Sequence, residues 1–133
     1  MQKIPINNLV LVAFVMVAYD AMASGMSRVA GIEYRYFMFG SLLLCGLIGF
    51  FVSWRTSFIW GIIAGFVAGL AESTLGWAVS TWIGPTTKAA PESITTDLIL
   101  FTIFVVMMSS AFFAAVGSGI AELIKRSGVS QEQ

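Results

Sequence analysis

The chain alternates between long apolar segments and short polar connections. A hydrocarbon core of about 30 Å needs roughly 20 helical residues to cross it. Segments of about that length run from about Asn8 to Ser24, Tyr36 to Val52, Phe58 to Ile83 and Thr96 to Ile124. The pattern therefore predicts an all-α fold, a polytopic integral membrane protein with four transmembrane helices.

The connections between these segments cover only about residues 25–35, 53–57 and 84–95. Short connections make successive helices antiparallel neighbours, so we expect an up-down bundle. We expect residues 1–133 to form a single transmembrane domain that ends in a polar, disordered tail at 125–133.

The first apolar segment has some features of a secretory signal. Lys3 precedes it, and the Ala21-Met22-Ala23 triplet resembles a cleavage site. Tyr19 and Asp20 interrupt the usual transition from apolar to small residues. We therefore expect this segment to be retained as a helix.

Composition supports a membrane location. Hydrophobic residues make up 58% of the chain and charged residues 11%, with a mean hydropathy of +0.90, whereas soluble domains are about 25% charged. Lipid is thus the expected surrounding. Formal net charge is +0 and no Lys/Arg-rich run is present, so nucleic acid is not an expected partner.

Catalytic and cofactor-binding groups are scarce. The chain has no histidine, and its single cysteine, Cys45, lies within an apolar run. No glycine-rich phosphate loop with its lysine and no carboxylate pair at metal-binding spacing can be found. We therefore expect no enzymatic activity, no catalytic residues, no metal site and no cofactor.

The third segment contains a regular set of small residues. Gly61, Gly65, Gly69, Glu72 and Gly76 are spaced four, four, three and four apart, which at about 100° per residue places them within an arc of about 80°. Small residues let a neighbouring helix approach closely, and close packing drives helix association in lipid. The stripe therefore predicts a tight helix crossing, within the chain or with another chain.

The fourth segment has a complementary small-residue face at Ser110, Ala114, Ser118 and Ala121. We expect this face to pack against the glycine stripe of the preceding segment, its antiparallel neighbour. Glu72 would then meet a serine. The hydroxyl side chains that are its expected partners are those of Ser73, Thr74, Ser80, Ser109, Ser110 and Ser118.

Glu72 is the most unusual residue of the apolar segments. A carboxylate near the middle of a bilayer costs roughly 2.5 kcal/mol or more unless it is protonated, paired or hydrated. Three roles are open: a structural acid that joins two helices, a proton or cation site in a pathway, or a contact to another subunit.

Asp20 lies near the predicted end of the first helix. A negative charge there opposes the helix dipole, so we expect an interfacial ion pair with Arg28 or Arg35, or exposure to lipid headgroups; a role in ion conduction is the alternative. Glu122 precedes Lys125 by three residues, the spacing of an ordinary surface pair.

The sequence leaves two classes of function open. The first is an accessory or scaffolding subunit that docks on other membrane protein subunits or on copies of itself. The alternative is a small oligomeric ion channel or proton-coupled transporter that uses Glu72.

The basic residues give a weak orientation signal. The positive-inside rule favours both termini in the cytoplasm, and hence the cytoplasmic (inner) membrane. This orientation places Lys3, Arg55, Lys125 and Arg126 inside and Arg28, Arg35 and Lys88 outside.

Overall fold

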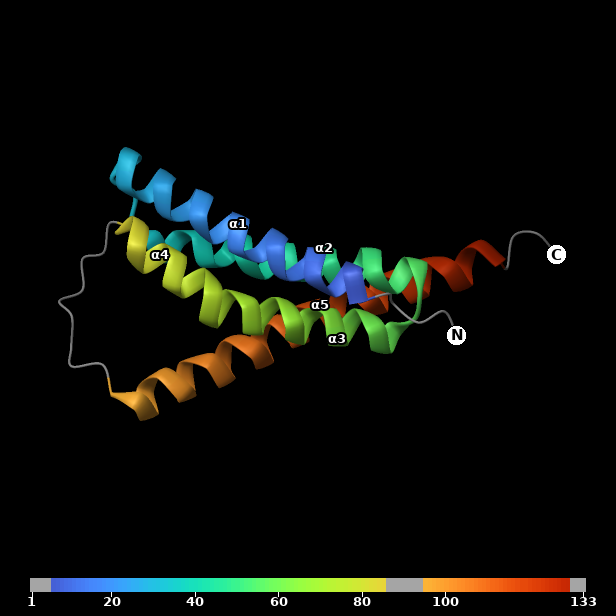
Figure 1. Cartoon of the computed structure of the whole chain (residues 1–133). Coiled ribbons are helices and arrows are strands. Elements are labelled where there is room, and N and C mark those ends of the chain that lie inside the picture. Colours follow the sequence, from blue (N-terminus) through green and yellow to red (C-terminus); the bar gives the residue numbers. More distant parts are fainter. Residues whose placement is uncertain (1–5, 86–94, 130–133) are drawn as a thin grey trace.

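The computed structural model describes residues 6–85 and 95–129, and all regular structure in this part is helical (Figure 1). The elements are α1 (Ile6–Ala30), the short 3₁₀ turn η1 (Tyr34–Tyr36), α2 (Phe37–Arg55), α3 (Phe58–Ala71), the π-helical turn η2 (Glu72–Gly76), α4 (Trp77–Ile83) and α5 (Thr96–Val129). α3, η2 and α4 follow one another without interruption and together form the third span.

Four helices in the described part are long and apolar enough to cross a membrane. This confirms the predicted all-α membrane bundle and the integral membrane location. α1 begins and α5 ends at the same end of the bundle (Figure 1). We call this the terminal end, which also holds Arg55 and Phe58; the distal end holds Ala30, Ile83 and Thr96.

The first helix is longer than the sequence predicts. It continues past Ser24 to Ala30 because its polar residues face inward, where Ser24 Oγ donates to Ser80 Oγ at 2.7 Å. A positive φ of 67° at Gly31, a conformation that favours glycine, follows the helix end.

The last helix also extends beyond its predicted end at Ile124. Lys125 Nζ donates to the Ser53 carbonyl oxygen at 2.6 Å and pairs with Glu122 Oε1 at 3.2 Å, so the predicted Glu122–Lys125 pair is present. These contacts hold α5 to α2 at Lys125, and the helix ends at Val129. The remainder of the predicted polar tail, 130–133, lies outside the described residues, as do Lys3 and Lys88.

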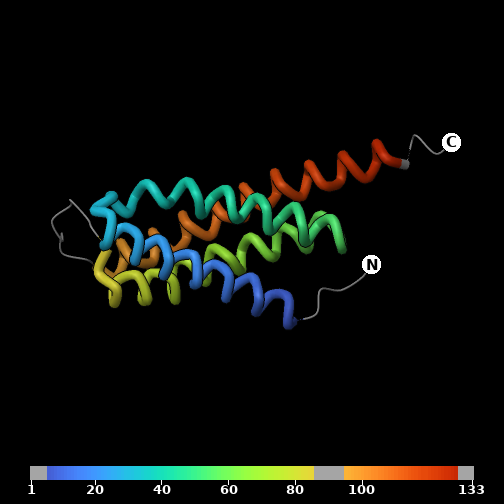
Figure 2. Tube along the Cα trace, turned by 90° about the horizontal axis from the view of Figure 1, so that it is seen from above, coloured from blue at the N-terminus to red at the C-terminus, as the bar shows by residue number. Residues whose placement is uncertain are grey.

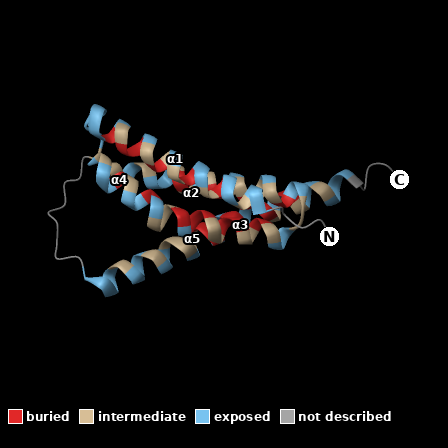
Figure 3. Ribbon diagram, in the orientation of Figure 1, coloured by how far each residue is buried: buried red, intermediate tan, exposed pale blue. Residues whose placement is uncertain are grey.

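The bundle has small residues inside and large apolar residues outside. The buried residues of α2 are Ser41, Cys45, Gly49 and Ser53, one per turn, whereas Phe101 of α5 is 65% exposed. Figure 3 shows the buried positions along the inner faces of the helices. Such an outer surface is stable in lipid, which solvates apolar side chains that water would not.

The tightest packing joins α2, α3 and α5 at one point in the terminal half. A methyl group on Gly61 of α3 would overlap Ser118 Oγ of α5 and would lie 2.8 Å from the Gly49 carbonyl oxygen of α2. The Ser118 hydroxyl donates to that same carbonyl at 3.0 Å. Three backbones therefore approach one another around a single satisfied hydroxyl.

The contact continues along α3 and α5. A methyl group on Gly65 would lie 3.0 Å from the Ser110 carbonyl oxygen and would overlap Ala114 Cβ, and one on Gly69 would lie 2.8 Å from Met107 Cα. The small face of α5 and the first three glycines of the stripe are thus in contact, as the sequence leads us to expect.

A second close contact, between α2 and α5, has no counterpart in the sequence analysis. A methyl group on Gly117 of α5 would overlap the Gly46 carbonyl oxygen, and one on Gly49 would lie 2.6 Å from Ala114 Cα. α5 therefore packs its backbone against α2 and α3 at once.

α1 attaches differently from the other three spans. It packs on α3, η2 and α4, and among the described residues none of its Cα atoms lies within 8 Å of a Cα atom of α5. Met16 of α1 is fully buried in one cluster with Cys45 of α2 and with Ala64 and Ala68 of α3. Figure 2 shows α1 beside the third span and away from α5 in the terminal half.

Replacing Gly117 by alanine is expected to destabilise the bundle. The atoms nearest the new methyl group would be backbone atoms, those of the Gly46 carbonyl and Phe50 N at 3.0 Å, and such overpacking costs about 1–3 kcal/mol. Unfolding of the purified protein in mixed micelles by increasing SDS, followed by circular dichroism, measures the difference.

Gly119→Ala is the matched control in the same helix, because nothing lies within 4 Å of its added methyl group. It should leave stability unchanged or raise it by up to about 1 kcal/mol, since alanine is the better helix former. Equal stability of the two variants would contradict the close contact of α2 and α5.

Candidate functional site

Asp20, Ser41 and Glu72 come from three different spans but lie at the same depth. At about 1.5 Å per helical residue, each is about 21 Å along its helix from the terminal end. The distal end lies about 15 Å from Asp20 and about 16 Å from Glu72. In a hydrocarbon core of about 30 Å, both acids are therefore deep in the membrane.

Asp20 is buried, with 3% of its surface exposed. The Tyr34 hydroxyl donates to its Oδ1 at 3.1 Å. Its Oδ2 is also buried and has no hydrogen-bond partner among the described residues. Gly76 lies against this carboxylate, because a methyl group there would overlap Oδ2.

The predicted interfacial ion pair of Asp20 is not formed, because α1 continues for more than two turns beyond this residue. Arg28 instead donates to the Ile83 carbonyl oxygen at 2.8 Å, and Arg35 pairs with Glu33 at 3.0 Å.

Glu72 is held by α2 and not by α5. The Ser41 hydroxyl donates to its Oε1, while its buried Oε2 has no hydrogen-bond partner in the described part of the chain. None of the predicted hydroxyl partners in the described residues bonds to Glu72: Ser118 donates to the Gly49 carbonyl, and Ser109 to the Val105 carbonyl of its own helix at 2.8 Å. The buried Ser110 hydroxyl has no hydrogen-bond partner in the described part of the chain.

A π-helical turn, η2, begins at Glu72. A π turn inserts an extra residue into a helix and is frequent at functional sites. Hydroxyl groups support the backbone where the wide turn starts: Ser73 Oγ donates to the Gly69 carbonyl at 2.7 Å, and Thr74 Oγ1 to the Leu70 carbonyl at 2.6 Å.

The π turn divides the predicted stripe into three parts. Gly61, Gly65 and Gly69 face α5, Glu72 bonds to α2, and Gly76 faces Asp20 of α1. The prediction of one narrow stripe assumed about 100° per residue throughout, which does not hold across a π turn. The helix is α-helical up to Glu72, whose backbone N–H bonds to the Ala68 carbonyl, so the wide turn changes the direction of the residues after the acid, Gly76 among them.

A chain of hydroxyl groups links Asp20 to the distal half of the bundle. Ser24 donates to Ser80, whose Oγ lies 3.1 Å from the Tyr34 hydroxyl oxygen. Because the only hydroxyl hydrogen of Tyr34 goes to Asp20, Ser80 is the donor in this pair. Neither Ser41 nor Tyr34 was identified as a site residue from the sequence.

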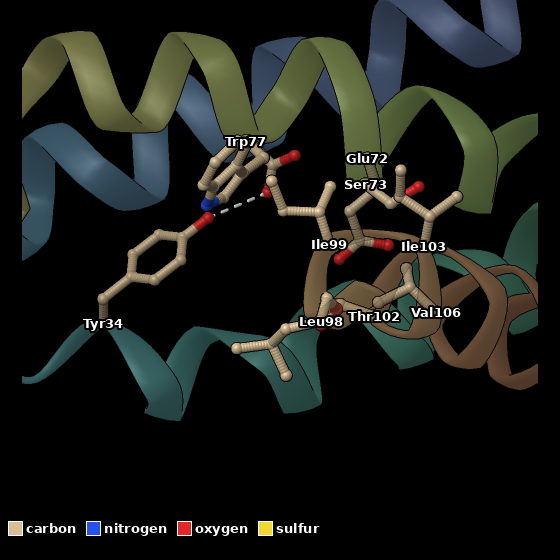
Figure 4. A pocket seen from close by; sticks show the side chains of 10 residues that line it. Tyr34, Glu72, Ser73, Trp77, Leu98, Ile99, Thr102, Ile103 and Val106 are labelled. Carbon is tan, nitrogen blue, oxygen red and sulfur yellow. Dashed lines mark hydrogen bonds between the residues drawn. The ribbon is translucent and has the colours of Figure 1, made fainter. Parts of the chain in front are cut away.

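The two acids line one cavity of about 330 Å³. Its other walls are Tyr34, Ser73 and Trp77 on one side and the distal half of α5 on the other, with Leu98, Ile99, Thr102, Ile103 and Val106. In Figure 4, Tyr34 and Trp77 line one end of the cavity, and Glu72 lies farther along it. Figure 1 shows this half of α5 diverging from α4.

The two carboxylates suit a proton or a monovalent cation better than a divalent metal ion. Within residues 6–85 and 95–129, no group of three or more His, Cys, Asp or Glu side chains could hold a metal ion, whereas Mg²⁺ and Ca²⁺ take six or more oxygen ligands. Two carboxylates that each have one oxygen not bonded by any described residue can bind and release a proton or a monovalent cation.

A scan against protein-family models and searches of curated proteins and of solved structures found no match to this chain.

Gly76→Ala is expected to displace the Asp20 carboxylate and to destabilise the bundle. The added methyl group overlaps Oδ2 and lies 2.9 Å from Cγ, so the buried Asp20 side chain must shift, at a cost of about 1–3 kcal/mol. The SDS unfolding of the Gly76→Ala protein measures this cost.

A double-mutant cycle with Asp20→Ala isolates the contact, because removing the carboxylate makes room for the methyl group. In that background Gly76→Ala should cost little. Gly25→Ala, where nothing lies within 4 Å of the added atom, is the control. The same cost with and without the carboxylate would show that Gly76 does not position Asp20.

Proposed function

We propose that this protein is a small membrane transporter that exchanges a monovalent cation for protons at Asp20 and Glu72. The single observation that carries the proposal is that two acids from different spans line one cavity deep in the bilayer, each with a buried oxygen to which no described residue donates a hydrogen bond.

The coupling follows from the cost of charge in hydrocarbon. A carboxylate in this position is stabilised either by a proton or by a cation, and the two compete for the same oxygen. A cation that binds therefore displaces a proton. Asp20 and Glu72 are close enough to share this competition, since both contribute to the walls of one cavity.

The two halves of the bundle support a pathway that opens at one end at a time. In the terminal half, the glycine and serine contacts of α2, α3 and α5 leave no room for a methyl group. In the distal half, the hydroxyl chain and the cavity lie between α1, α4 and the diverging part of α5. With both termini in the cytoplasm, the cavity faces the outer side of the inner membrane.

An accessory subunit is the second candidate. The glycine stripe no longer supports it, because Gly61, Gly65 and Gly69 pack inside the chain. A groove of about 390 Å³ between α2 and α5 favours it instead, since Gly46 and Gly117 are among its lining residues and the rest are apolar. A partner helix on this groove would co-purify with the protein in a mild detergent.

Proton exchange can be measured in proteoliposomes with an acidic interior and an internal pH-sensitive dye. Sodium, potassium or tetraethylammonium chloride is added outside, and at least one of them should make the interior more alkaline. Glu72→Gln keeps the size of the side chain but cannot release a proton, so it should lower the rate at least about tenfold.

Glu122→Gln is the matched control, since Glu122 pairs with Lys125 outside the cavity. It should leave the rate unchanged. A Glu72→Gln protein as active as the parent would refute proton exchange at this site. No response to any cation, together with co-purification of larger subunits, would favour the accessory role.

A further inference from the structure

We infer that the cation bound in this cavity is an amphipathic organic monocation, a substituted ammonium group joined to an apolar part. The inference rests on the proposed function and specifies its substrate class. It follows from the charge, the aromatic rings and the size of the cavity.

The charge of the site matches one cation and one proton. Asp20 and Glu72 each present one buried oxygen that no described residue bonds, while the other oxygen is held by Tyr34 and Ser41, respectively. One monocation and one proton neutralise the two carboxyl groups, and so do two protons. Exchange between these states moves one proton per organic cation, with no net charge left in the hydrocarbon.

The aromatic rings lie where the charged group would be. Tyr34 bonds to Asp20, and its ring and that of Trp77 stand at the same end of the cavity (Figure 4). Tyrosine and tryptophan faces attract ammonium groups, and the attraction strengthens when water is excluded. Aromatic rings supply no ligand to a small metal ion, so this end of the cavity favours an alkylated ammonium.

The size and the opposite wall require an apolar part. The cavity measures about 330 Å³, whereas a water molecule occupies about 30 Å³ in the liquid, so an inorganic cation leaves most of the space empty. Leu98, Ile103 and Val106 of α5 form an aliphatic wall along it. A ligand with an ammonium head at Asp20 and a hydrocarbon part against α5 fills both regions.

The probe is benzyltrimethylammonium, and its control is neopentylbenzene, which has the same shape with carbon in place of the charged nitrogen. Binding to the full chain in a neutral detergent is followed by calorimetry at pH 8 in a weakly buffered solution. We expect saturable binding of benzyltrimethylammonium with release of about one proton, weakened at least tenfold by Asp20→Asn. Neopentylbenzene should release none.

Three variants at two tryptophans keep the test independent of the folding of the Asp20→Asn protein. Trp77 is 49% exposed, so the Trp77→Leu protein should fold. This variant should weaken the binding of benzyltrimethylammonium at least fivefold. Trp77→Phe keeps an aromatic ring and should weaken binding less. Trp82 is 87% exposed and outside the cavity, so Trp82→Leu should bind as the parent does. Equal affinity of the Trp77→Leu and Trp82→Leu proteins would overturn the inference, as would binding without proton release.

The inference and the proposed function fail in different ways. If sodium or potassium drives Glu72-dependent proton movement but benzyltrimethylammonium does not bind, exchange stands and the organic substrate is wrong. If benzyltrimethylammonium binds and proton movement is unaffected by Glu72→Gln, the cavity is a cation site but the exchange mechanism is wrong.

Discussion

The structure depends on the approach of three helix backbones at Gly49, Gly61 and Ser118. In lipid, apolar side chains gain little by leaving one apolar medium for another, so association must come from van der Waals contact and hydrogen bonds at short range. At this point α2, α3 and α5 provide both, because two residues lack side chains and the third donates its hydroxyl to a backbone carbonyl. The large apolar residues are left free to face lipid.

This contact determines where the bundle can open. α5 is bound along its middle and terminal half to α2 and α3, and its close contacts with the glycines of α3 end near Met107 and Ser110. Beyond them, toward Thr96, the helix diverges from α4, and the cavity occupies the space between (Figures 1 and 4). The firmly packed terminal half therefore stabilises the bundle, and the distal half can contain two buried acids.

The sequence predicts the spans and one of the two close contacts, and it does so for physical reasons. Segment length and hydropathy are set by bilayer thickness, and glycine spacing is set by the helical repeat. The contact between α2 and α5 was missed although Ser41, Cys45, Gly49 and Ser53 recur every fourth residue in the second segment. That period carries the signal, and it also identifies Ser41, the partner of Glu72.

Other features of the site could not be predicted because they depend on tertiary contacts. Ser24 and Ser27 resemble loop residues in a sequence, yet they are buried on the inner face of α1 and carry the helix on to Ala30. Only that extension places Asp20 deep in the membrane. The π turn has no reliable sequence signature, so the contact of Gly76, at its end, with Asp20 of α1 could not be predicted.

Because of the π turn, the glycines of the third span contact two different helices, α5 and α1, which the stripe of one regular helix would not do. Up to Gly69, the glycines of the helix pack closely against α5 and contribute to the tight packing of the terminal half. A regular continuation would have kept Gly76 on that same face. By turning wider after Glu72, the backbone places Gly76 where the Asp20 carboxylate needs room, while Glu72 bonds to Ser41 and lines the cavity. Serine and threonine hydroxyls satisfy the carbonyls at the start of the wide turn, so this change of direction does not leave them unbonded in the membrane.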